Sequence, residues 1–120
     1  MKKILLLDDN TDFLEMMKLI LQPRYEVRSS TNFLDCLSLV ETFQPDLLIV
    51  DYFFGDEEFT EVPDQWKDVS GKFVPFILCS AINDIQEKAD AMGAIGYISK
   101  PSSVSVIRGY IDDHFKYRFK

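Results

Sequence analysis

The chain has 120 residues, the size of one ordinary domain, so we expect residues 1–120 to form a single unit. Hydrophobic residues make up 47% of it, which is enough for a core and argues against intrinsic disorder. The formal net charge of −7 argues against nucleic-acid binding, because a phosphate backbone requires clustered Lys and Arg.

Cysteine usage and hydropathy indicate a cytoplasmic protein. Cys36 and Cys79 lie in apolar stretches without metal-ligand spacing, and no signal peptide precedes them, so we expect two reduced structural thiols. The apolar run Ile4–Leu7 is far shorter than the roughly 20 residues that are needed to cross a bilayer. We therefore expect a cytoplasmic chain with no membrane contact.

The first half of the chain alternates short apolar strands with amphipathic helices. Residues 3–8 are predicted to form a strand, and Thr11 or Asp12 is expected to cap a helix that Pro23 ends. A second strand (25–29), a second helix (32–43) and a third strand (47–51) follow. The core-facing side chains of the two helices are predicted to be Phe13, Met16, Met17, Ile20 and Leu21, then Phe33, Leu37, Val40 and Phe43.

The second half of the chain begins with the least regular segment, residues 52–73. Its acids and Pro63 disfavour a long helix, and a short helix from about Thr60 through Trp66 is expected there. A fourth strand (74–80), a helix (84–92) closed by Gly93, and a fifth strand (96–99) follow. The last helix is predicted from about residue 103, with Val104, Ile107, Ile111 and Phe115 facing inward.

This alternation of elements predicts an α/β fold with one parallel sheet. Strands that are apolar on both faces require helices on both sides of the sheet. Because crossover connections are right-handed, few arrangements remain, and a doubly wound sheet of five strands is the leading one.

Three aspartates follow two of the predicted strands. Asp8 and Asp9 come after the first strand, and Asp51 ends the third. Ligands bind beyond the carboxyl ends of strands in such sheets, so the three carboxylates meet at one edge if these strands are neighbours. Carboxylates so close repel unless a cation lies among them, and an oxygen-only site favours Mg²⁺ before Zn²⁺. The simpler alternative is that these acids cap helices or face solvent.

The fourth and fifth strands end in Ser80 and Lys100, at the same predicted edge. A lysine is a point charge suited to a phosphoryl oxygen, and a serine hydroxyl can donate a hydrogen bond to another. Taken singly, Lys100 also fits a solvated surface lysine, and Ser80 fits a turn residue.

Four motifs, in order along the chain, resemble the receiver domains of two-component signalling. They are LLLDDN (5–10), LLIVDY (47–52), LCSA (78–81) and GYISKPS (96–102). The match covers essentially the whole chain. The resemblance implies a single receiver domain over residues 1–120. It also implies a flavodoxin-like doubly wound five-stranded parallel sheet, in the strand order 2-1-3-4-5, with five helices of which the third is short.

The resemblance implies an acceptor and a metal site among the aspartates. Asp51 is implied as the phosphoryl acceptor, supplied by a sensor histidine kinase or a phosphotransfer protein. Asp9 and Asp51 would hold Mg²⁺ directly, Asp8 would help through water, and the backbone carbonyl of Phe53 would be a further ligand.

The remaining implied roles concern the phosphoryl group and a switch. Lys100 would pair with the phosphoryl group, Ser80 would hydrogen-bond to it, and the backbone N–H groups of Phe53 and Ala81 would complete the site. Tyr97 matches the family's switch aromatic, which can rotate inward when Ser80 moves. This would alter the surface of the fourth helix, fifth strand and fifth helix, the candidate face for a downstream protein target or a homodimer.

The loop after Asp51 departs from the family pattern: receivers usually carry a Pro and a Gly that shape a tight loop, whereas the run here is YFFGD (52–56), and we expect a reshaped loop with Phe53 and Phe54 partly exposed beside the site. Phe53 and Ile82 occupy two positions that influence removal of the phosphoryl group by water. Apolar groups there cannot orient an attacking water, so slow self-dephosphorylation is expected. Apart from this and self-phosphorylation, we expect no enzyme activity. Phe53, Phe54 and Phe59 fit either a partner-docking patch or core packing under a rearranged loop.

Two alternative functions remain open at this point. The first is a pseudo-receiver, with the same fold acting as a docking module that is not phosphorylated. The second is a small phosphohydrolase of the haloacid-dehalogenase kind, which uses a strand-end aspartate and a second aspartate two residues later. Phe53 occupies that second position here.

Overall fold

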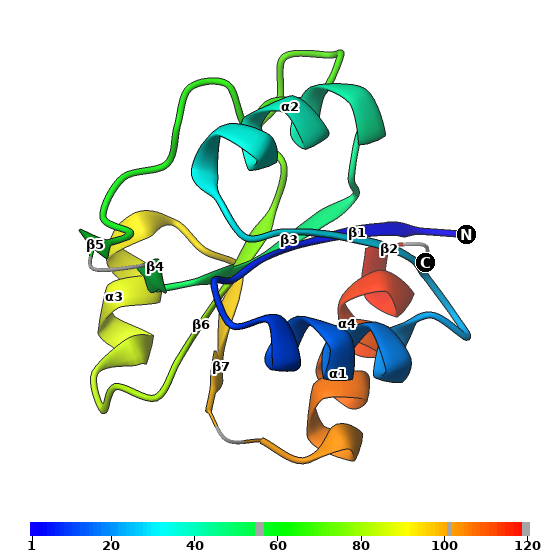
Figure 1. The fold of residues 1–120 in the computed structure, drawn as a ribbon, viewed down its shortest axis with the longest axis vertical. Coiled ribbons are helices and arrows are strands. Elements are labelled where there is room, and N and C mark those ends of the chain that lie inside the picture. The colour runs from blue at the N-terminus through cyan, green and yellow to red at the C-terminus, as the bar shows by residue number, and fades with distance from the viewer. Residues whose placement is uncertain (55–56, 101, 119–120) are drawn as a thin grey trace.

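Five parallel strands form the central sheet of the protein. The computed structural model describes residues 1–54, 57–100 and 102–118, and for residues 57, 117 and 118 it describes the backbone only. The strands are β1 (Lys3–Leu7), β2 (Glu26–Ser30), β3 (Leu47–Asp51), β6 (Phe76–Ser80) and β7 (Gly96–Ser99). Their order across the sheet is β2-β1-β3-β6-β7 (Figure 1). The predicted order 2-1-3-4-5 is therefore confirmed.

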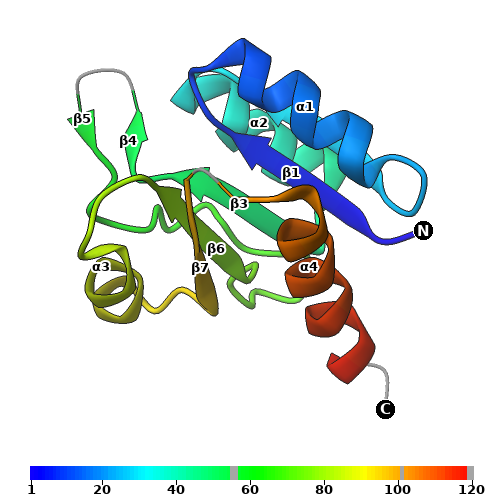
Figure 2. The ribbon, with the colours of Figure 1, turned by 90° about the horizontal axis from the view of Figure 1, so that it is seen from below.

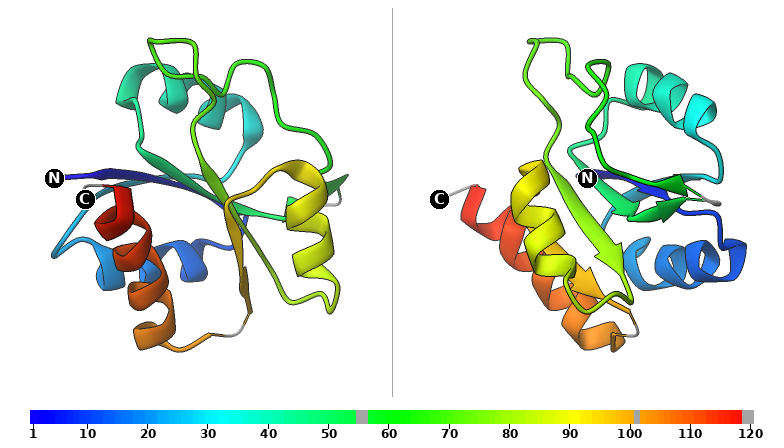
Figure 3. Two further views of the ribbon diagram at one scale, coloured as in Figure 1. Left: turned by 180° about the vertical axis from the view of Figure 1, so that it is seen from behind. Right: turned by 90° about the vertical axis from the view of Figure 1, so that its left-hand side faces the viewer.

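Four helices cover the two faces of the sheet in the part of the chain that the structure describes. They are α1 (Thr11–Leu21), α2 (Phe33–Phe43), α3 (Ile85–Met92) and α4 (Val104–Arg118). Helices α1 and α4 lie on one face of the sheet, and α2 and α3 lie on the other (Figures 1 and 3). None of the described helices is both long and apolar enough to cross a bilayer.

The first two helices begin with an asparagine cap. The Asn10 side chain accepts a hydrogen bond from the Phe13 N–H at 3.1 Å, and the Asn32 side chain accepts one from the Asp35 N–H at 2.8 Å. The prediction that Thr11 or Asp12 caps α1 was wrong. Thr11 is the first helical residue, and an asparagine immediately before it satisfies a free helical N–H equally well.

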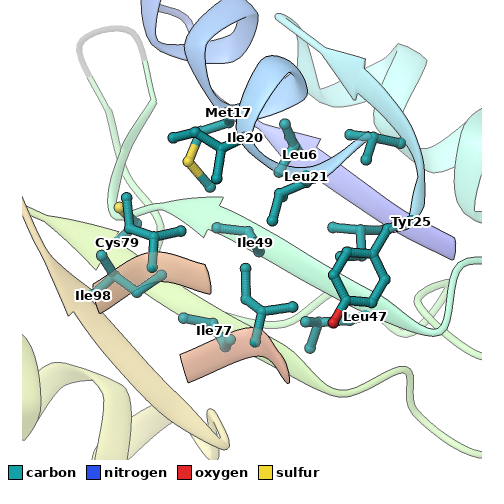
Figure 4. Packing of buried hydrophobic residues seen from close by; sticks show 14 of the residues in the cluster. Leu6, Met17, Ile20, Leu21, Tyr25, Leu47, Ile49, Ile77, Cys79 and Ile98 are labelled. Carbon is teal, nitrogen blue, oxygen red and sulfur yellow. The ribbon is translucent and has the colours of Figure 1, made fainter. Parts of the chain in front are cut away.

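The core on the α1 side lies between that helix, α4 and the sheet (Figure 4). Its α1 residues are Leu14, Met17, Ile20 and Leu21, whereas Met16 is 41% exposed and Phe13 is only partly buried. The inward face of α1 is thus rotated from the predicted one toward Leu14. In α4 the core residues are Ile107, Ile111 and Phe115.

The opposite face of the sheet is covered by Cys36, Val40 and Phe43 of α2 together with Ile85 and Ala89 of α3. Leu37 is partly buried against this second cluster. Phe33 and Val104, both predicted to face inward, are exposed; each is the first residue of its helix, where the chain has only begun to cover the sheet.

The segment after β3 contains a small hairpin in place of the predicted third helix. Strands β4 (Phe53–Phe54) and β5 (Glu57–Glu58) pair antiparallel, and the hairpin stands at the end of β3 (Figure 2). The Tyr52 hydroxyl donates to Glu58 Oε2 at 3.0 Å, and the Phe59 N–H donates to the Tyr52 carbonyl. The hairpin is thereby tied to the end of the central sheet.

The predicted helix from about Thr60 through Trp66 is wrong, and with it the count of five helices. Around Pro63 the chain makes only a single turn, in which the Trp66 N–H donates to the Pro63 carbonyl. The Trp66 carbonyl then accepts from the Val74 N–H, and Lys67 pairs antiparallel with Phe73, so the chain continues from Trp66 in an extended conformation. Burial of aromatic rings favours this path: Phe59 stacks on Trp66 with 5.2 Å between centroids, and Trp66 is fully buried.

Candidate functional site

The carboxyl ends of four strands carry the predicted site residues to one edge of the sheet. Asp8 follows β1, and Asp51 ends the neighbouring strand β3. Ser80 ends β6, and Lys100 follows β7. Because these strands are parallel and adjacent, residues separated by up to 92 positions in sequence lie close together.

Lys100 is the cationic centre of this edge. Its Nζ lies 2.8 Å from Asp8 Oδ2 and 3.5 Å from Asp51 Oδ2. The side chains of Asp8 and Asp51 are 3% and 11% exposed, so both ion pairs are largely shielded from water. A lysine in this position is a donor to acidic oxygens rather than the solvated surface group of the simpler alternative.

Asp8, Asp9 and Asp51 form a carboxylate cluster. One oxygen from each lies within 4.8 Å of the others, with Asp8 and Asp51 buried and Asp9 exposed. Asp8 is fixed by the Asn10 N–H, which donates to its Oδ1 at 2.9 Å. A set of three carboxylates with one ligand open to solvent suits a hard divalent cation that keeps some of its water, which fits Mg²⁺.

The electrostatics of Asp51 reflect this crowding. Burial and the negative charge of Asp8 raise the pKa of Asp51 to about 6, against the opposing effect of Lys100 and of a backbone hydrogen bond from Phe53. For Lys100, burial lowers the pKa, but the hydrogen bond that it donates to Asp8 and the negative charges of Asp51 and Asp8 outweigh this effect and leave the pKa raised. The lysine therefore stays charged at neutral pH, next to an Asp51 carboxyl group whose pKa is raised.

One backbone donor contacts the Asp51 carboxylate, and a buried serine ends the neighbouring strand β6. The Phe53 N–H donates to Asp51 Oδ1 at 3.3 Å. Ser80 is buried, and its Oγ accepts from the Ile82 N–H at 3.3 Å while its carbonyl accepts from the Lys100 N–H. Ala81, immediately after Ser80, is exposed and lines a pocket together with Lys100.

Tyr97 and the three phenylalanines lie in different environments. Tyr97 is half-buried on β7, and its hydroxyl lies 3.4 Å from Gln86 Oε1 of α3. Phe53 is 40% exposed beside Asp51, and Phe54 is partly buried. Phe59 is buried on Trp66, so core packing rather than an exposed docking patch accounts for it.

Two residues contact the site without having been assigned to it from the sequence. Asn10 joins Asp8 to the start of α1, and the Phe13 ring lies 4.1 Å from Lys100 Nζ, measured to its centroid. The sequence signal was available for Asn10, which is a preferred capping residue that follows the acidic pair. Phe13 had been interpreted as a core residue of the helix, and nothing in its spacing distinguishes the two roles.

Comparisons of the sequence with known proteins all point to the same family. The family model described as "Response regulator receiver domain" matches residues 4–112. The chain is 25% identical over 115 residues to the chemotaxis protein CheY of Halobacterium salinarum, covering 93% of this chain and 95% of that protein. It is 29% identical over 118 residues to the nisin biosynthesis regulatory protein NisR of Lactococcus lactis, covering 95% of this chain but only 50% of that protein.

The fold is also found among solved structures. A two-component response regulator from Clostridium difficile superposes with a TM-score of 0.84 at 15% identity, and the match covers 100% of both chains. At this identity the likeness supports the fold alone.

The raised pKa of Asp51 predicts that its carboxylate destabilises the metal-free protein at neutral pH. Because the folded protein binds this proton more tightly than the unfolded chain, the stabilising contribution is present below about pH 4 and is lost as pH rises through about 6. Asp51→Asn should therefore raise the free energy of unfolding at about pH 8 by on the order of 2 kcal/mol, and by little near pH 4. Urea unfolding in EDTA at both pH values measures this difference.

Asp12→Asn is the matched control, because Asp12 is exposed on the first turn of α1 and should change little at either pH. A wild type that is more stable than Asp51→Asn at about pH 8 would contradict the inferred pKa.

Proposed function

The chain belongs to the response regulator receiver family, and from this premise we propose that residues 1–120 act as one phosphoacceptor domain whose acceptor is Asp51. Receiver domains are signalling phosphoacceptors and not enzymes in the ordinary sense. The observation that carries the proposal is the position of Lys100, with Nζ 3.5 Å from Asp51 and 2.8 Å from Asp8.

The acceptor step requires a nucleophilic oxygen and compensation of charge. An Asp51 oxygen forms a bond to the phosphorus atom while the bond between phosphorus and the donor's leaving group breaks. Negative charge then increases at the end of β3, next to Asp8. Lys100 compensates this charge, and because it is held by two acids in the resting state it requires little reorganisation.

The carboxylate cluster is the proposed Mg²⁺ site. Asp9 and Asp51 would hold the ion directly, Asp8 would act through water, and the Phe53 carbonyl would complete the protein ligands. A bound Mg²⁺ would supply electrostatic stabilisation for the phosphoryl oxygens and relieve the repulsion that raises the pKa of Asp51.

Three further groups are proposed to contact the phosphoryl group. The Phe53 N–H already donates to the Asp51 carboxylate, and the Ala81 N–H follows Ser80 at the end of the adjacent strand. The Ser80 hydroxyl accepts from the Ile82 N–H in the resting state and can rotate to donate to a phosphoryl oxygen.

The proposed output is a change of surface that begins at Ser80. If Ser80 turns toward a phosphoryl group, the half-buried Tyr97 can move inward and exchange its contact with Gln86. This would alter the face formed by α3, β7 and α4. Phosphorylation would thereby shift the equilibrium between two side-chain arrangements of this face. We propose this face for a downstream protein target or a homodimer.

The proposed input partner is a sensor histidine kinase or a phosphotransfer protein. We place the domain in the cytoplasm, in agreement with its two free, buried cysteines, Cys36 and Cys79. The pseudo-receiver alternative is not favoured, because a docking module requires neither a buried acceptor carboxylate nor a lysine paired with it.

The direct test is intact-mass measurement after incubation with acetyl phosphate, with Mg²⁺ or with EDTA. Wild type should gain one phosphoryl group only with Mg²⁺, and Asp51→Asn should gain none. Lys100→Met should lower the rate of phosphorylation by about a hundredfold, since it removes the charge that stabilises the transferred group.

Asp12→Asn is the control, because it removes a carboxylate of the same helix end that lies outside the cluster. A folded wild type that gains no phosphoryl group with Mg²⁺ present would refute the proposed function and favour the pseudo-receiver.

Removal of the phosphoryl group by water is expected to be slow, because Phe53 and Ile82 flank the acceptor with apolar groups. Phe53→Asn introduces a side chain that can orient a water by hydrogen bonding, and it should accelerate dephosphorylation by about tenfold. Phe53→Leu, which keeps an apolar side chain, should change the rate little. The decay of phosphorylated protein, followed by intact mass after removal of the donor, measures all three rates, and equal rates would exclude this role of Phe53.

A further inference from the structure

We propose that Phe13 is a positioning residue that holds the Lys100 ammonium group through a cation–π contact. The Lys100 Nζ lies 4.1 Å from the centroid of the Phe13 ring, well within the roughly 6 Å range of such contacts. The inference rests on the proposed function and adds a positioning residue to the same site.

Two carboxylates and one aromatic ring are among the neighbours of the ammonium group. Asp8 and Asp51 contact it as carboxylates, and both are also proposed for Mg²⁺ or for the phosphoryl group. Phe13 is neutral and competes for neither. When the carboxylates take up their other ligands, the ring is therefore the neighbour whose attraction for Lys100 is unchanged.

The position of Phe13 is fixed by the same turn that fixes Asp8. The Asn10 N–H donates to Asp8 Oδ1 at 2.9 Å, and the Phe13 N–H donates to Asn10 Oδ1 at 3.1 Å. This chain of hydrogen bonds couples the backbone of Phe13 to the buried carboxylate. The ring and Asp8 thus approach Lys100 from one hydrogen-bonded turn, which leads from β1 into α1.

Lys100 has room to leave this position. Its side chain is 23% exposed and borders an open, largely apolar pocket of about 370 Å³, which Phe13, Met16 and Ile107 also line. A lysine side chain has many rotamers, so an anchor that restricts them reduces the entropy lost when the group contacts the phosphoryl oxygens. An ordinary packing role for Phe13 would need only an apolar side chain of similar volume.

The electronic character of the ring separates these two roles. Replacing Phe13 by pentafluorophenylalanine keeps an apolar ring but reverses its quadrupole, and Phe13→Leu removes the ring. Both should slow phosphorylation of Asp51 by acetyl phosphate at saturating Mg²⁺ by about threefold to tenfold. Phe13→Tyr, which retains an electron-rich ring, should restore the wild-type rate to within about twofold.

Proton NMR of the unphosphorylated protein gives a readout that is independent of activity. The ε-methylene protons of Lys100 should be shifted upfield by the ring current in wild type and in Phe13→Tyr, and this shift should be absent in Phe13→Leu. Met16→Leu is the matched control, because it alters an apolar side chain of the same pocket and helix and should leave the rate and the Lys100 signals unchanged.

The outcomes distinguish this inference from the proposed function. A wild type that is phosphorylated on Asp51, together with a pentafluorophenylalanine variant of equal rate, would overturn the role of Phe13 alone. Absence of the upfield shift in wild type would do the same. A folded wild type that cannot be phosphorylated would overturn the proposed function, and the role of Phe13 with it.

Discussion

The architecture of the site depends on the contact of one ammonium group with two buried carboxylates. Lys100 pairs with Asp8 and Asp51 across three neighbouring strands, β1, β3 and β6, although it follows β7 at the edge of the sheet. Breaking such a contact leaves buried charge uncompensated, which is costly, so the parallel sheet must hold these strand ends in register. The ion pairs by themselves give little net stability, so the proposed acceptor chemistry explains this arrangement better than folding does.

The single positive charge of Lys100 does not balance the three carboxylates of the cluster, which keeps an excess of negative charge. Asp9 joins Asp8 and Asp51 within 4.8 Å, and the pKa of Asp51 is raised to about 6 despite the adjacent lysine. A divalent cation would offset this charge, and in the proposed function the cation and the lysine would then share the oxygens of a phosphoryl group. The β4–β5 hairpin and the aromatic stack of Phe59 on Trp66 lie beyond this cluster, and they replace a helix without displacing Asp51 from the end of β3.

The parts of the fold that could be predicted from the sequence are those set by local pattern. The apolar run Leu47–Val50 before Asp51 could only be a buried strand, and the helical periodicity around Met17 and Val40 predicted the right helices. The face of α1 was less certain, because Phe13 and Leu14 are both apolar and only the observed cap at Asn10 sets the rotation of the helix. The helix predicted from Thr60 to Trp66 was wrong for a different reason: the path of this segment follows from packing of Phe59 and Trp66 on strands that are distant in sequence, which no local pattern encodes.

For the site, the strand-end positions of Asp8, Asp51 and Lys100 predicted that these residues lie close together. The Phe13–Lys100 contact is a tertiary contact for which the sequence gives no signal.

The central claim is that the carboxylate cluster, with Lys100 as its competing cation, is built to take up Mg²⁺ beside an acceptor aspartate. Calorimetric titration of Mg²⁺ into wild type, Asp51→Asn and Lys100→Met tests it most directly. One ion should bind to wild type, Asp51→Asn should bind it at least about tenfold more weakly, and Lys100→Met should bind it more tightly because the cluster has lost its own positive charge. Absence of binding to wild type, or an affinity that neither substitution changes, would contradict the account.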